Sequence, residues 1–153
     1  MLCARQAYAT IRFMSRSITN PQTRELIRYV FVYGTLRRGQ VRDVNRLRPT
    51  PLFIGNGQVK GTLYDLDSYP GLCLKGEQQV QGEVYQITPE LEQQLDEIEE
   101  VWPKQSGEYA KRDTRLNCEG VELTCLVYEV SDARSQGCSV IESGDWVAHS
   151  RLS

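Results

Sequence analysis

The sequence predicts one small domain of the α+β class, built on a largely antiparallel sheet or barrel. Two observations carry this prediction. Short segments rich in β-branched and aromatic residues recur between turn-forming residues. One strongly amphipathic segment, after Thr88, has the spacing of a helix. The chain has 153 residues, 40% of them hydrophobic, which is enough for a single domain with a buried core.

Residues 1–28 differ in charge from the rest of the chain. They hold five arginines and one acid, whereas the remainder is net acidic. We expect residues 1–28 to be an N-terminal extension and residues 29–153 to form the domain. The extension resembles a mitochondrial transit peptide, but a disordered tail or an upstream start, with Met14 as the initiator, stays open. The location is accordingly cytoplasmic, or mitochondrial if the extension is a transit peptide.

The first half of the domain is predicted to consist mainly of strands. Residues 29–33 form a run that is apolar on both faces and ends at Gly34, which predicts a buried strand. Pro49 is expected to stop a short helical turn over residues 42–48. Further strands are predicted at residues 52–54, 59–66, 72–74 and 80–87, with a turn at Asn56-Gly57 and another at residues 69–71.

The second half begins with the helix. Thr88 is the expected N-cap, Pro89 lies in the first turn, and the helix is predicted to continue to about Trp102. Residues 109–116 and 121–130 then form a predicted hairpin, turned at residues 117–120.

Several classes of function are disfavoured by composition. The body is acidic, so it lacks the basic face that nucleic acids require. No apolar run is long enough to span a membrane. The sequence after Gly34 begins like a P-loop, but Gln40 and Val41 replace the phosphate-binding Lys and the Ser or Thr. With His149 as the single histidine and five cysteines without a CxxC pair, no metal site and no cofactor are predicted.

Glu99 is the helix acid expected nearest the core. Leu91, Leu95, Ile98 and Trp102 form the apolar stripe, and Glu99 lies about 70° from its centre at about 100° per residue. Asp96 and the other acids lie farther away and are expected to face solvent. Partial burial would raise the pKa of Glu99 and make it a better base; a boundary carboxylate paired with a Lys or Arg is the alternative.

An ordered set of motifs resembles the γ-glutamyl cyclotransferase-like family, also called AIG2-like. The set runs along most of the chain and consists of Tyr33-Gly34-Thr35-Leu36, residues 61–66 with Tyr69-Pro70-Gly71-Leu72, residues 80–85, Leu95-Asp96-Glu97-Ile98-Glu99, residues 109–112 and Gly144-Asp145-Trp146.

The resemblance implies a small mixed, mostly antiparallel β-barrel with flanking helices. It implies that Glu99 is the general base, and that Tyr33, Gly34, Thr35, Leu36 and Tyr109 bind a small γ-glutamyl substrate. The implied reaction is intramolecular aminolysis that releases 5-oxoproline and an amine or amino acid, without a metal or cofactor.

The chain departs from the family at one position. The family usually places Gly after the catalytic Glu, and this chain has Glu100. The identity of the γ-glutamyl compound and the oligomeric state stay open. A non-catalytic binding module of the same fold is the alternative function.

Overall fold

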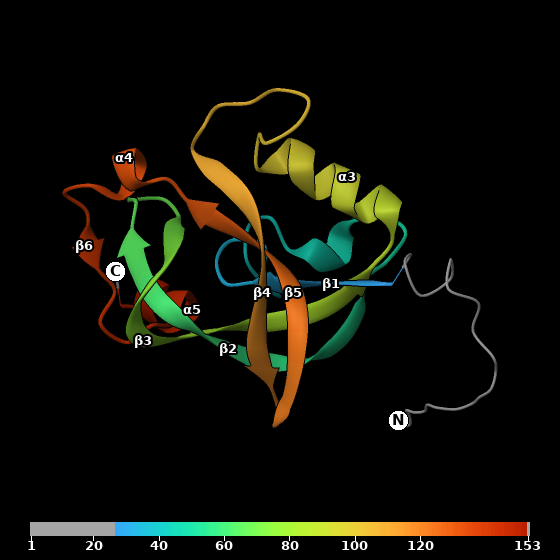
Figure 1. Ribbon diagram of the computed structural model, residues 1–153, viewed down its shortest axis with the longest axis horizontal. Helices are drawn as coiled ribbons and strands as arrows, with labels where there is room; N and C mark the ends of the chain where they lie inside the picture. Colours follow the sequence, from blue (N-terminus) through green and yellow to red (C-terminus); the bar gives the residue numbers. More distant parts are fainter. Residues whose placement is uncertain (1–26, 153) are drawn as a thin grey trace.

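The computed structural model describes residues 27–152, so the predicted extension lies outside the described residues except for Ile27 and Arg28. The strands are β1 (Arg28–Val32), β2 (Leu52–Asp65), β3 (Pro70–Ile87), β4 (Tyr109–Cys118), β5 (Val121–Val130) and β6 (Ser139–Val140). The helices are the 3-10 turn η2 (Val44–Arg46) and α3 (Pro89–Ile98), α4 (Asp132–Ser135) and α5 (Trp146–Ser150). Figure 1 shows α3 lying beside a curved sheet.

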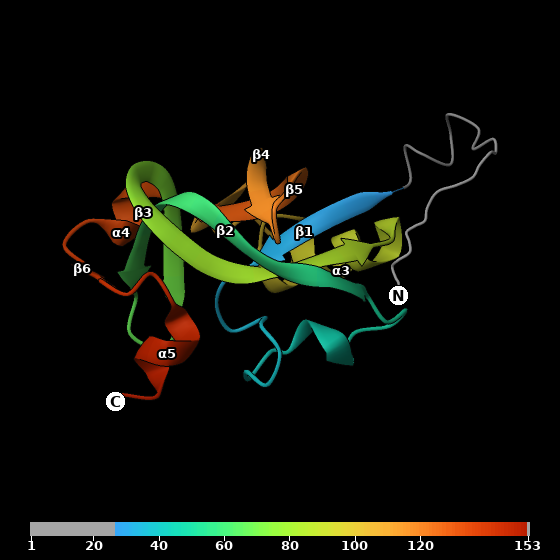
Figure 2. The same cartoon turned by 90° about the horizontal axis from the view of Figure 1, so that it is seen from below.

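Five of these strands close into a barrel. β1 pairs with β3, β3 with β2, β2 with β4 and β4 with β5, all antiparallel, and β5 returns to β1 in a parallel pairing at Val30 and Leu126. β6 adds to the edge of β2. The predicted α+β fold with a mixed, mostly antiparallel barrel is therefore confirmed. Figure 2 shows the segment between β1 and β2 on the opposite side of the barrel from β4 and β5.

The strands β2 and β3 are longer than predicted. The sequence predicted a turn at Asn56-Gly57, but β2 runs through it, and the two predicted strands that follow Pro70 are one strand as well. Register shifts near Gly55 and between Gly61 and Thr62 bend the pair without ending it. A strand that bends around a small barrel keeps its pairing where an isolated Asn-Gly sequence would favour a turn.

The hairpin between β4 and β5 follows its turn chemistry. Cys118 pairs with Val121, so the loop is the two-residue sequence Glu119-Gly120. Both loop residues have positive φ, 48° and 88°, as a type I′ turn requires. The predicted turn region is confirmed.

The helix α3 is shorter than predicted. Thr88 caps it as expected, accepting a hydrogen bond from the Leu91 amide, but it ends at Ile98 with Glu99 as C-cap. Trp102 therefore lies beyond the helix and is 58% exposed, so its predicted place in the apolar stripe is wrong. Asp96, predicted to face solvent, is buried. The Trp102 difference arises because the helix ends before that residue, and the Asp96 difference arises because Lys111 and Tyr128 of the barrel wall contact its carboxylate.

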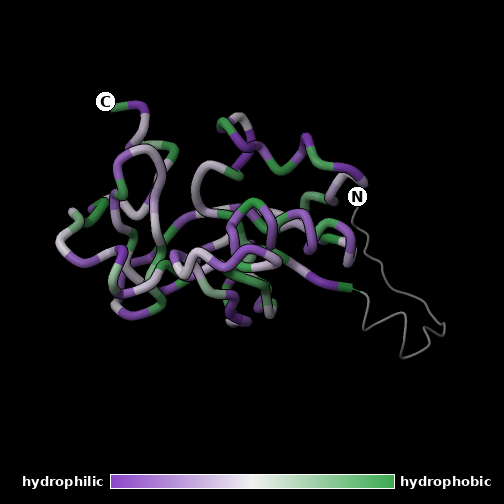
Figure 3. The backbone as a smooth tube through the Cα atoms, turned by 90° about the horizontal axis from the view of Figure 1, so that it is seen from above, coloured by the Kyte–Doolittle hydropathy of each residue, from purple (hydrophilic) through white to green (hydrophobic). Residues whose placement is uncertain are grey.

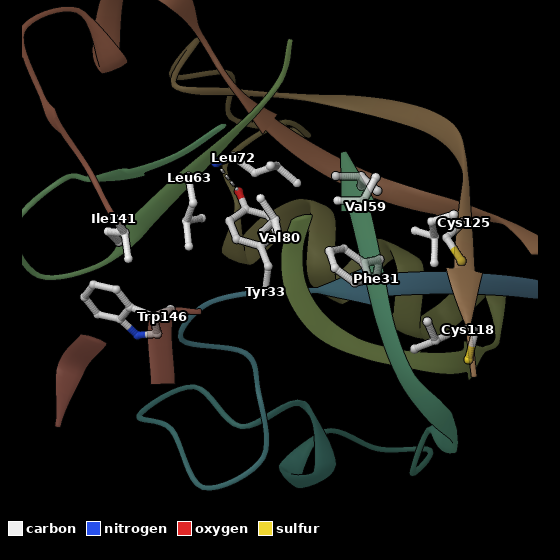
Figure 4. Close-up of a cluster of buried hydrophobic side chains, with 13 residues drawn as sticks. Phe31, Tyr33, Val59, Leu63, Leu72, Val80, Cys118, Cys125, Ile141 and Trp146 are labelled. Carbon is white, nitrogen blue, oxygen red and sulfur yellow. Dashed lines mark hydrogen bonds between the residues drawn. The ribbon is translucent and has the colours of Figure 1, made fainter. Parts of the chain in front are cut away.

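The core divides into two clusters. One fills the barrel and includes Phe31, Tyr33 and Trp146; Figure 4 shows Trp146 and Ile141 at one end and the cysteines of β4 and β5 at the other. The second cluster holds Leu91 and Leu95 of α3 against the outer faces of β1, β3 and β5. Strand β1 contributes to both clusters, which explains its uninterrupted apolar sequence.

Hydrophilic and hydrophobic residues alternate at short intervals along the backbone, and no long stretch is of one kind (Figure 3). Within residues 27–152, no helix is long and apolar enough to cross a membrane. The four cysteines in this range are free, and Cys73, Cys118 and Cys125 are buried.

Candidate functional site

A cavity of about 420 Å³ opens between the end of β1 and the C-terminus of α3. Its volume is in the range of small-molecule sites. It is lined by residues 31–36, 41–42, 68–70, 98–100 and 108–109, together with Tyr128. All the residues predicted to form the site, namely Glu99, Tyr33, Gly34, Thr35, Leu36 and Tyr109, line this one cavity.

The loop after β1 forms one wall. Gly34 is tightly placed, because a Cβ on it would lie 2.6 Å from Cγ of Pro70. The loop folds back on itself, with the Arg37 amide donating to the Gly34 carbonyl and the Val44 amide to the Leu36 carbonyl. Within residues 27–152, the amides of Gly34, Thr35 and Leu36 have no acceptor. Adjacent free amides of this kind are suited to bind a carboxylate or an oxyanion.

The opposite wall carries Glu99, which is positioned by the end of α3. The Val101 amide donates to the Asp96 carbonyl, and the Glu100 amide donates to the Glu97 carbonyl. These two bonds form a Schellman motif. Glu100 takes the left-handed conformation that the motif requires, with a φ of 57°. The position where the family usually has Gly is thus a helix-terminating position, and here Glu occupies it in the same conformation.

The Glu99 carboxylate makes no hydrogen bond or ion pair within the described part of the chain. Desolvation by burial raises its pKa to about 7; the negative charge of Glu108 adds to the rise, and the positive charge of Arg42 opposes it. Glu99 nevertheless keeps partial solvent access on the cavity side. A carboxylate with this pKa is half ionised near neutral pH, where it can both accept and return a proton.

Three tyrosines surround this carboxylate, and the hydroxyl of each already has a partner. Tyr33 donates to the Tyr128 carbonyl at 2.7 Å, Tyr109 to the Pro70 carbonyl at 2.9 Å, and Tyr128 to the Asp96 carboxylate at 2.7 Å. Burial raises the pKa of all three phenols, so they are neutral at physiological pH. They form a rigid wall around Glu99 and offer it no cation.

The Tyr33 hydroxyl is directed into the barrel core. It also accepts a hydrogen bond from the Leu72 amide at 3.2 Å, as Figure 4 shows. Because its hydroxyl already donates one hydrogen bond and accepts another, we expect Tyr33 to shape the cavity rather than to donate a hydrogen bond to a ligand.

Residues that the sequence did not single out complete the cavity. Glu108 lies beside Glu99 and is held by the Tyr69 hydroxyl at 2.6 Å and the Arg134 guanidinium at 3.1 Å. Arg42 supplies positive charge at the opening. No local motif marks these residues, since each comes from a loop whose position depends on the barrel.

The arrangement places the Glu99 carboxylate and the backbone amides of the loop after β1 on opposite walls of a cavity that is partly lined by tyrosines. Within residues 27–152, no group of His, Cys, Asp and Glu side chains is arranged to hold a metal ion. The groups present can remove a proton from a bound ligand at Glu99 and stabilise negative charge at the loop.

Comparisons with known proteins match this architecture. Residues 30–148 match the family described as "Gamma-glutamyl cyclotransferase, AIG2-like". A Vibrio cholerae protein named "Putative gamma-glutamylcyclotransferase" is 37% identical over 117 residues, covering 76% of this chain and 93% of that protein. The "Gamma-L-glutamyl-butirosin B gamma-glutamyl cyclotransferase" of Niallia circulans is 33% identical over 59% of this chain and 56% of that enzyme. The crystal structure of an AIG2-like protein from Mus musculus has a TM-score of 0.63 at 25% identity, covering 76% of this chain and 87% of that one.

Proposed function

This chain belongs to the gamma-glutamyl cyclotransferase, AIG2-like family, and we propose that it is an enzyme that releases 5-oxoproline from a γ-glutamyl amide, with Glu99 as general base. The observation that carries the proposal is the state of Glu99. Among residues 27–152 its carboxylate has no hydrogen-bond or ion-pair partner, it lines a cavity, and burial raises its pKa to about 7. A structural carboxylate in such surroundings would be expected to have a cationic partner.

The reaction needs one proton acceptor and one site for negative charge. Glu99 removes a proton from the α-ammonium group of the substrate. The free amine attacks the γ-carbonyl carbon, which closes the five-membered ring with a new C–N bond. The protonated Glu99 gives this proton to the leaving nitrogen as the bond between that nitrogen and the carbon breaks. The ionised Glu99 then takes the second proton from the ring nitrogen and passes it to the free amine, which leaves as an ammonium ion. The proton balance closes on one residue, which fits a carboxyl whose pKa lies near neutrality.

We assign to the loop after β1 the role of binding the anionic groups of the substrate. The amides of Gly34, Thr35 and Leu36 have no acceptor within the described residues. They would hold the α-carboxylate or the oxyanion that forms at the γ-carbonyl. Because nucleophile and electrophile belong to one molecule, holding the substrate in its folded conformation contributes much of the rate. Tyr109 shapes the wall, since its hydroxyl is already bound to Pro70.

The test is the variant Glu99→Gln, assayed for 5-oxoproline against a panel of γ-glutamyl amino acids and γ-glutamylamines. The side chain keeps its shape but cannot accept the proton, so we expect kcat to fall on the order of 10²- to 10⁴-fold. The matched control is Glu97→Gln, which removes an exposed carboxylate two residues away and should change kcat less than about threefold.

Three outcomes are informative. Loss of activity in Glu99→Gln alone supports the assignment. Near-normal activity of that variant means that another group is the base. Saturable binding of a γ-glutamyl compound by the wild-type protein without release of 5-oxoproline would favour the non-catalytic binding module instead.

A further inference from the structure

Arg42 is the only lysine or arginine among the described residues that line the cavity. It lies in the loop between β1 and η2 and is exposed at the opening. Its backbone amide donates to the Thr35 carbonyl, which ties it to the loop that carries the free amides. Its guanidinium makes no hydrogen bond or ion pair with any residue of the range 27–152.

The other arginines of the same loop are all engaged. Arg37 forms ion pairs with Glu83 and Asp145. Arg38 stacks over the Phe53 ring at 4.9 Å, and the guanidinium groups of Arg46 and Arg48 bond to backbone carbonyls of the loop. Arg42 is thus the exception in a segment where arginine side chains otherwise hold the loop together.

The acids of the cavity do not neutralise Arg42. Glu108 is held by Tyr69 and Arg134, and Glu100 lies 3.7 Å from Lys104. The positive charge of Arg42 lowers the pKa of Glu99, but the two side chains form no ion pair. A guanidinium at the opening of a binding cavity, with no anion from the described residues paired to it, is suited to an anionic group of the ligand, and its planar donors match a carboxylate.

We propose that Arg42 is a substrate-binding, specificity-determining residue that holds a carboxylate on the leaving amine. The substrate class is then γ-glutamyl amino acids or peptides that carry a carboxylate next to the scissile amide, in preference to γ-glutamyl derivatives of uncharged amines. The inference rests on the proposed function, because that function identifies which end of the ligand is the leaving group.

The position of Arg42 assigns it to the leaving group rather than to the glutamyl end. The free amides of the buried Gly34 and Leu36 lie on the inner wall, where the glutamyl group has to meet Glu99. The leaving amine departs through the opening, where Arg42 is exposed. An added carboxylate there would be repelled by the acids of the cavity unless a cation met it.

A matched pair of substrates isolates the contact. γ-Glutamylalanine and γ-glutamylethylamide differ only in the carboxylate of the leaving amine. We would measure kcat/KM for both with the wild-type protein, Arg42→Gln, Arg42→Lys and the control Arg46→Gln, at a pH well above the pKa of Glu99. Arg46 lies four residues later, at the end of η2, carries the same charge and does not line the cavity. Binding of both compounds to Glu99→Gln, with and without Arg42→Gln, gives a second readout that is independent of turnover.

We expect Arg42→Gln to lower kcat/KM for γ-glutamylalanine roughly 5- to 50-fold and to change the value for γ-glutamylethylamide less than about threefold. Arg42→Lys should recover part of the loss, and Arg46→Gln should leave the ratio of the two kcat/KM values unchanged. Any effect that Arg42 exerts through the pKa of Glu99 changes kcat/KM by the same factor for both substrates, so it cancels in the ratio of the two values.

Equal losses on both substrates, or no loss on either, would overturn the assignment while leaving the proposed function standing. Binding of γ-glutamylalanine that depends on Arg42, without turnover of any γ-glutamyl compound by the wild-type protein, would support Arg42 and overturn the proposed function. If the wild-type protein neither binds nor converts γ-glutamylalanine, both fail.

Discussion

The carboxylate of Asp96 accepts a hydrogen bond of 2.7 Å from the hydroxyl of Tyr128, which joins the last turn of α3 to strand β5. The other carboxylate oxygen of Asp96 accepts a hydrogen bond from Lys111 at 3.0 Å. The backbone carbonyl of Asp96 also receives the Val101 amide that ends the helix. One residue thus fixes the end of the helix against the barrel, three positions before Glu99.

We therefore expect Tyr128→Phe to destabilise the fold. The buried Asp96 would lose one of its two side-chain partners, which typically costs about 1–3 kcal/mol. Tyr64→Phe is the control, because the Tyr64 hydroxyl has no hydrogen-bond partner within residues 27–152. Urea unfolding midpoints measure the difference. A loss in Tyr128→Phe no larger than that in Tyr64→Phe would mean that the bond contributes nothing net.

The Glu100→Gly variant should be more stable than the wild-type protein. Glu100 has a φ of 57°, which costs a residue with a Cβ about 1 kcal/mol and costs glycine little. The ion pair with Lys104 that would be lost is exposed and contributes little. We expect a gain of about 0.5–1 kcal/mol in the free energy of unfolding.

The matched substitution within the helix should have the opposite effect on the free energy of unfolding. Glu97→Gly places glycine inside α3 and should cost about 1 kcal/mol. If both glycine variants lose stability, the left-handed conformation at position 100 does not control the helix end.

The activity should depend on pH through Glu99. The base must be ionised to act, so kcat/KM should rise with pH through about 7. The negative charge of Glu108 helps to raise the pKa of Glu99, so Glu108→Gln should move this limb of the profile to lower pH. Glu142→Gln, which removes an exposed carboxylate outside the cavity, should leave the limb in place. A limb that Glu108→Gln leaves unmoved would belong to another group.

Glu99 should also lower the stability of the fold at alkaline pH. Its pKa of about 7 in the native protein lies above the ordinary value of 4.5. The native state therefore binds more protons between these values, and the free energy of unfolding falls as pH rises through this window. The penalty is complete above pH 7 and, allowing for partial exposure, amounts to about 1–3 kcal/mol.

The Glu99→Gln variant should remove this penalty. We expect it to be more stable than the wild-type protein above about pH 8 and equal to it near pH 4. Thermal or urea unfolding across this range measures the difference, and Glu97→Gln should show none. A constant difference at all pH values would mean that burial of the charge is not its source.

Local chemistry that depends on neighbouring residues could be predicted from the sequence. The Thr88 cap, the turn after Cys118 and the buried strand β1 follow from side-chain and backbone preferences that act over a few residues. The placement of Glu99 beside the core was predicted from helical periodicity, and it holds because the first two turns of α3 follow that periodicity. Trp102 was misplaced because the same periodicity was extended past the end of the helix at Ile98. Asp96 was misplaced because that periodicity took no account of its partners Lys111 and Tyr128 on the barrel wall.

The sequence by itself determined the α+β class, the bounds of β1, β4 and β5 to within two residues, the start of α3, and the order of motifs from Tyr33 to Trp146. Only the tertiary structure decided which groups around Glu99 are free. The hydroxyl of Tyr33 is used by Leu72 and Tyr128, and Glu108 is held by Arg134, whereas the Arg42 side chain at the opening has no partner in the part of the chain that the structure describes. Closure of the barrel brings these residues together from distant parts of the chain, and hydrogen bonds between such residues leave no periodic trace in the sequence.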